Sequence, residues 1–113
     1  MKLGRELDLL VAEHIFGYTV FSKLNGSIVN QHDELDAPNF YSTDISAAWE
    51  VVEKMENYFE LTKIVIELAK TKTVYTAKIL IGNDSFKVHS ESAPHAICLA
   101  ALKAKGVEIG NHE

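Results

Sequence analysis

The sequence predicts an α+β fold, an α/β/α layered sandwich with the element order α-α-β-β-β-α and a small antiparallel meander sheet. Two observations predict it. Apolar residues recur at helical spacing in two segments of the first half of the chain, and short alternating segments joined by tight turns follow in the second half. A helix with one apolar stripe must bury that stripe against a second layer, and a small sheet provides one.

Composition sets the broad class. The chain has 113 residues, of which 47% are apolar and 24% charged, so we expect one globular domain over 1–113. The net charge of −5 disfavours a polyanion as partner. The single cysteine, Cys98, excludes an internal disulfide and is expected to be a buried, inert thiol. No apolar run reaches the ~18 residues of a membrane span, and no signal peptide is recognisable.

The first element is predicted to be a helix over 3–16. Its apolar stripe ends at Gly17, a residue typical of a helix C-cap, and consists of Leu7, Leu10, Val11 and Ile15. A loop is expected over 22–40, where Asn25-Gly26 and several acidic residues interrupt any pattern. A small strand over 27–30 is an open alternative within this loop.

The second helix is predicted over 44–57, after three consecutive capping candidates, Ser42, Thr43 and Asp44. Its apolar positions follow at three- and four-residue steps: Ile45, Ala48, Trp49, Val52, Met55 and Phe59. This stripe predicts that Trp49 is buried in the core.

Three strands are predicted over 59–68, 73–81 and 85–89, with turns at 69–72 and 82–84. Short turns favour antiparallel pairing. Both faces of the sheet carry branched apolar residues, and the two later helices can cover only one of them. We therefore expect the first helix to fold over the other face, which gives helix–sheet–helix layers.

The last helix is predicted over 93–105. Ser92 is its expected cap, Pro94 falls in the first turn, and Gly106 stops it before a flexible tail at 107–113. Alanines dominate the buried stripe of this helix, so it can approach a sheet closely.

One local cluster has the side chains of metal or acid–base chemistry: His89, Glu91 and His95. Its spacing matches no ligand motif, and ordinary structural roles explain these residues equally well. The chain also lacks the phosphate-binding and hydrolase motifs. We therefore expect no metal or cofactor, and a non-enzymatic protein.

A second candidate is the acidic stretch Asp33, Glu34 and Asp36, together with His32. It could present negative charge to a basic surface of another protein, and a merely solvated loop is the competing interpretation.

The core order α-β-β-β-α is similar to that of a double-stranded-RNA-binding domain. Such domains carry lysines at the start of the final helix, where this chain has Ser92-Ala93-Pro94-His95-Ala96. Nucleic-acid binding is therefore disfavoured.

Three strings resemble the signature segments of the phage ABA sandwich domain family. They read GRELDLLVAE at 4–13, YSTDISAAWEVVEK at 41–54 and APHAICLAAL at 93–102. The resemblance implies a layered α/β fold and a viral origin, and it implies no catalytic residues.

The resulting hypothesis is a phage or prophage accessory protein that binds a host protein in the host cytoplasm, as a monomer or weak homodimer. Two alternatives stay open. One is sequestration of a small nucleotide signal, a small-molecule ligand, and the other is catalysis at His89, Glu91 and His95.

Overall fold

The computed structural model describes residues 4–30, 32–58, 64–71, 74–81 and 84–107, and for 56–58, 64–71 and 81 it describes the backbone. The beginning of the strand predicted over 59–68 and the tail predicted beyond Val107 lie outside the described residues.

The α+β class and the antiparallel meander are confirmed. The meander has the strand order β4-β5-β6, and a second antiparallel sheet has the order β1-β2-β3. The helices and strands in chain order are α1 (Arg5–His14), β1 (Thr19–Ser22), β2 (Ser27–Val29), β3 (Leu35–Asp36), α2 (Ile45–Tyr58), β4 (Ile64–Thr71), β5 (Val74–Ile81), β6 (Asp84–Ser90) and α3 (Ala93–Ala104).

Three predicted boundaries are wrong. Helix α1 is shorter than 3–16, because Gly4, with a φ of 134°, precedes it and the helix ends at His14. The loop predicted over 22–40 contains β2, which matches the small strand considered over 27–30, and β3, whose two residues are too few to show a period. The turn predicted at 69–72 begins too early, because β4 pairs with β5 as far as Thr71.

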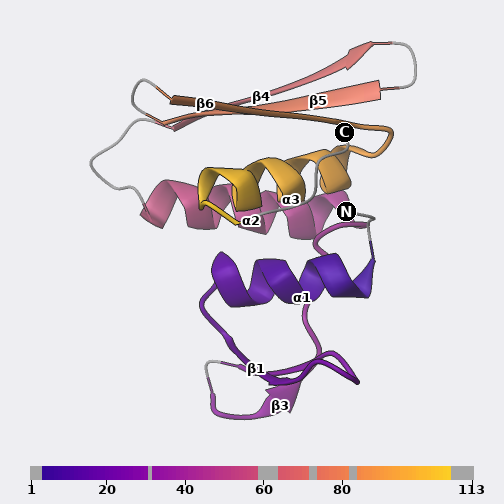
Figure 1. Ribbon diagram of the computed structural model, residues 1–113, viewed down its shortest axis with the longest axis vertical. Coiled ribbons are helices and arrows are strands. Elements are labelled where there is room, and N and C mark those ends of the chain that lie inside the picture. The colour runs from indigo at the N-terminus through magenta and orange to yellow at the C-terminus, as the bar shows by residue number, and fades with distance from the viewer. Residues whose placement is uncertain (1–3, 31, 59–63, 72–73, 82–83, 108–113) are drawn as a thin grey trace.

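The elements are stacked in layers (Figure 1). The β4–β6 sheet covers one side of the α2 and α3 layer, and α3 packs against both β5 and β6. Helix α1 packs on the other side of α3, and the β1–β3 sheet lies beyond α1. The core therefore spans all three helices, with Leu7, Val11, Val51, Ile79, Leu99 and Leu102 among its largest buried side chains.

The expected position of the first helix, over the far face of the β4–β6 sheet, is wrong. Figure 1 shows α1 on the opposite side of α3 from that sheet. The described side chains of the far face are mainly polar, with Val74 and Leu80 of β5 as the apolar exceptions. There Lys78 lies across from Lys87, and Thr76 across from His89, with 2.8 Å between the Thr76 Oγ1 and His89 Nδ1 atoms. A polar face needs no covering layer.

The prediction that Trp49 is buried is also wrong, because 48% of this residue is exposed and Ile45 is 41% exposed. Helix α2 instead buries Ala47, Ala48, Val51 and Met55. The buried stripe is rotated by about one position from the predicted one. Helix α2 packs against α3, and the residues that it buries include two alanines, whereas the larger ring of Trp49 is half exposed.

The ends of α3 follow the sequence prediction. The backbone N–H of His95 donates to Ser92 Oγ at 3.5 Å, and Pro94 lies in the first turn. At the other end Gly106 adopts a φ of 84°, and the Val107 N–H donates to the Leu102 carbonyl at 2.9 Å. Cys98 is fully buried within the helix, as predicted.

Candidate functional site

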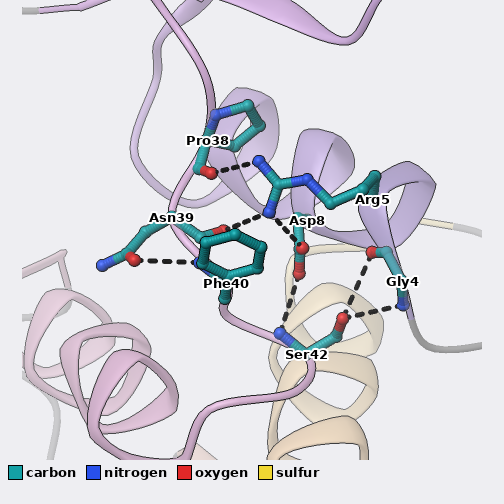
Figure 2. A network of polar contacts seen from close by, with 7 residues as sticks. All are labelled: Gly4, Arg5, Asp8, Pro38, Asn39, Phe40 and Ser42. Carbon is teal, nitrogen blue, oxygen red and sulfur yellow. Dashed lines mark hydrogen bonds and ion pairs between the residues drawn. The ribbon is translucent and has the colours of Figure 1, made fainter.

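The start of α1 is tied to the segment that leads into α2 through one buried carboxylate (Figure 2). Asp8 has no exposed surface, and its Oδ1 accepts a 2.8 Å hydrogen bond from the backbone N–H of Ser42. The Ser42 hydroxyl in turn accepts from the Gly4 N–H at 2.9 Å and lies 3.2 Å from the Gly4 carbonyl. These contacts satisfy a buried charge and two backbone groups at once.

Arg5 completes this network from the solvent side. Its Nη1 donates to Asp8 Oδ2 at 2.8 Å, and its guanidinium also donates to the carbonyls of Pro38 and Asn39. The guanidinium carbon lies 4.3 Å from the centre of the Phe40 ring, a cation–π contact. Arg5 therefore fixes residues 38–40 against α1 and shapes the surface beside them.

A surface hollow of about 550 Å³ lies next to this network. It lies between the end of the β1–β3 sheet and the first turns of α2. The lining side chains that matter for its chemistry are Tyr18, Asn30, Asp36, Phe40, Tyr41 and Glu50.

The wall of the hollow is aromatic. The Phe16 ring stacks on Tyr41 with 4.9 Å between centroids and lies 6.0 Å from the Tyr18 centroid. Burial raises the pKa of Tyr41 well above its usual range, and the neighbouring Tyr18 and Glu50 raise it further. Tyr41 therefore stays a neutral phenol at physiological pH.

The predicted acidic stretch forms the edge of this hollow. Asn30 organises the loop after β2, because its side-chain oxygen accepts from the N–H groups of His32 and Glu34 at 2.8 and 3.1 Å. Asp33 occupies the left-handed region with a φ of 61°. Asp33, Glu34 and Asp36 are all exposed, and of the three it is Asp36 that lines the hollow.

The structure gives His89 and His95 separate partners. The ring of His89 contacts Thr76 on the far face of the sheet, whereas the buried His95 ring lies 2.7 Å from Ser90 Oγ through its Nδ1. Successive strand residues point to opposite faces, so His89 and Ser90 direct these contacts to different sides of β6. Glu91 is exposed at the strand exit. Within the described part of the chain, no three histidine, cysteine or acidic side chains converge to hold a metal ion.

The sequence prediction missed a second feature, the outer face of α2, which we define by Ile45, Trp49 and Val52. The first two are exposed and Val52 is half-buried. These positions are spaced four and three residues apart, so their side chains share one side of the helix. Just before the helix, Phe40 is 55% exposed. The sequence does indicate this face, because α2 has two apolar stripes and packing against one neighbouring layer buries only one of them.

The chain belongs to the Phage ABA sandwich domain family, whose model matches residues 9–102. A 2.0 Å crystal structure of a phage protein from Bacillus cereus ATCC 14579 is similar, with 30% sequence identity over 90% of each chain and a TM-score of 0.71. No curated protein matches the chain. These findings identify a phage protein with this small α+β fold. The match begins at Leu9, so Arg5 and Asp8 precede it, whereas Pro38 and Ser42 lie within it.

None of the helices in the described ranges combines the length and apolar character needed to cross a membrane.

Proposed function

We propose that this phage protein acts in the host cytoplasm by binding a basic host protein through the outer face of α2 and the acidic groups around it. The observation that carries the proposal is the exposure of Ile45 and Trp49 beside the buried stripe of the same helix. Exposed tryptophan is costly in water and is enriched at the centres of protein interfaces.

Charge around this face supports a basic partner. Helix α2 carries Glu50, Glu53 and Glu56 against one lysine, Lys54, and Asp44 precedes its first turn. Complementary charge steers association and selects against partners of like sign. A second copy of this chain is a poor occupant, because a twofold contact through Trp49 would bring the same glutamates together.

Nucleotide sequestration receives less support from the hollow beside α2. Asp36 and Glu50 line it, and carboxylates repel phosphate groups. The arginine that borders it, Arg5, is already engaged by Asp8 and two backbone carbonyls.

Affinity capture from a host lysate with three matched baits tests the proposal. The baits are the wild-type protein, an outer-face variant with Ile45→Gln and Trp49→Gln, and a control with Val74→Gln. Val74 is exposed on β5, away from the outer face of α2. We expect a basic protein that is retained by the wild type and the control, is lost from the outer-face variant and elutes at raised salt. Equal recovery by all three baits, or recovery of acidic proteins alone, would contradict it.

A further inference from the structure

We propose that the hollow beside α2 binds one cationic side chain of the basic partner. The side chain that fits it best is the guanidinium of an arginine. This inference deepens the proposed function and rests on it for the source of the cation. It concerns a different set of residues from the outer face of α2, so it can be tested separately.

The first argument is unmatched negative charge. Two carboxylates from distant parts of the sequence, Asp36 and Glu50, line the same hollow. Neither forms an ion pair with any cation in the described part of the chain. Asp36 accepts from the Ala37 N–H at 2.8 Å and from Asn30 Nδ2 at 3.4 Å, and Glu50 accepts from Asn39 Nδ2 at 3.2 Å. A carboxylate has about four acceptor positions, so both retain free capacity for a charged donor.

The second argument concerns Arg5, the one arginine in the lining, which also contains the basic side chain of His32. The charge of Arg5 is neutralised by the fully buried Asp8. The guanidinium of Arg5 donates to Asp8 and to the carbonyls of residues 38 and 39. Arg5 is therefore not available to Asp36 or Glu50, and neither carboxylate forms an ion pair with His32.

The third argument is the aromatic wall. Tyr18 and Tyr41 line the hollow, and both contact Phe16. Tyr41 is only 3% exposed, so the half-buried Tyr18 is the ring that a ligand can reach. Aromatic faces attract cations, and a planar guanidinium can also stack on them while its N–H groups reach carboxylates. The volume of about 550 Å³ exceeds what one side chain needs, which leaves room for the alkyl stem and for water. A cavity that combines free carboxylates with aromatic rings selects a cation rather than an anion or a neutral apolar group.

A titration of the full-length ¹⁵N-labelled protein with single capped amino acids tests this inference without the partner. The probes are N-acetyl-arginine methylamide, its lysine analogue, and N-acetyl-citrulline methylamide as a neutral group of the same shape. We expect saturable shifts of the Asn30, Ala37 and Glu50 amides with arginine, smaller ones with lysine and none with citrulline.

The variants Asp36→Asn and Glu50→Gln should each weaken arginine binding by about threefold, the size of an exposed charge contact. Glu53→Gln removes an exposed charge of the same helix outside the hollow and should leave the affinity unchanged. Equal shifts with arginine and citrulline, or an affinity that neither hollow variant changes, would overturn the inference. Loss of capture by the outer-face variant would in that case still stand, so failure of the hollow and failure of the proposed function are distinguishable.

Discussion

A few single residues connect the start of α1 to the segment that precedes α2. Asp8 carries a charge with no exposed surface, and it is stabilised by one guanidinium and one backbone N–H. Such a group is stable only when its partners are present, because water cannot replace them. The sequence placed Asp8 inside a helical string but gave no sign of its burial, since its partner Ser42 lies 34 residues away.

The Arg5–Asp8 pair should therefore contribute strongly to stability. Arg5→Ala removes the ion-pair partner of the buried Asp8 carboxylate, and we expect the free energy of unfolding to fall by about 2–3 kcal/mol. This is below the about 3–5 kcal/mol of a fully buried pair, because the Arg5 side chain is 43% exposed. Chemical denaturation measures the change. Glu6→Ala, on the same turn but exposed, is the control and should change stability by less than about 0.5 kcal/mol. Equal effects of the two substitutions would show that the network is not stabilising.

Trp49 and Met55 should differ sharply although both belong to α2. Met55 is 1% exposed, so Met55→Ala leaves a cavity and should cost about 2–5 kcal/mol. Trp49 is half exposed, and Trp49→Ala should cost less than about 1 kcal/mol. Thermal melts of the two variants compare them directly. A larger loss from Trp49→Ala than from Met55→Ala would mean that the sequence-based stripe was the right one.

At the scale of elements, sequence periodicity found the helices and most of the buried stripes of α1 and α3, but it chose the wrong face of α2. Helix α2 has two overlapping apolar stripes, and the choice between them depends on the fit of α2 against α3, in which Ala47 and Ala48 are buried. That fit is a property of the pair of helices. The strand β3 was missed for a related reason, since its two residues gain their structure from pairing with β2 rather than from local preference.

The close contact between helix layers predicts a low tolerance for volume on α3. Ala100 is fully buried, and Ala100→Leu should destabilise the protein by about 1–3 kcal/mol through overpacking. Lys103→Leu introduces the same side chain at an exposed position of the same helix and serves as the control. Denaturation curves should separate them, and a stabilising effect of Ala100→Leu would reveal unfilled space beside α3.

At the scale of the whole molecule, the layers divide the surface into regions with different chemistry. The far face of the β4–β6 sheet presents Lys78 and Lys87 directly across from each other, whereas the hollow and the outer face of α2 are acidic and aromatic. The acidic residues of 32–36 could be recognised from sequence. Their neighbours could not, because Tyr18, Asp36 and Glu50 come from three separate segments that only the fold brings together.

The central claim is that the outer face of α2 is free in the isolated protein and covered by a basic partner in the host. Trp49 is the single tryptophan, so 5-fluorotryptophan labelling gives one ¹⁹F NMR resonance that reports on this face. We predict a clear shift of that resonance between H₂O and D₂O in the free protein, and broadening on addition of host lysate that raised salt reverses. A resonance that is insensitive to D₂O, or one that host lysate leaves unchanged, would contradict the account.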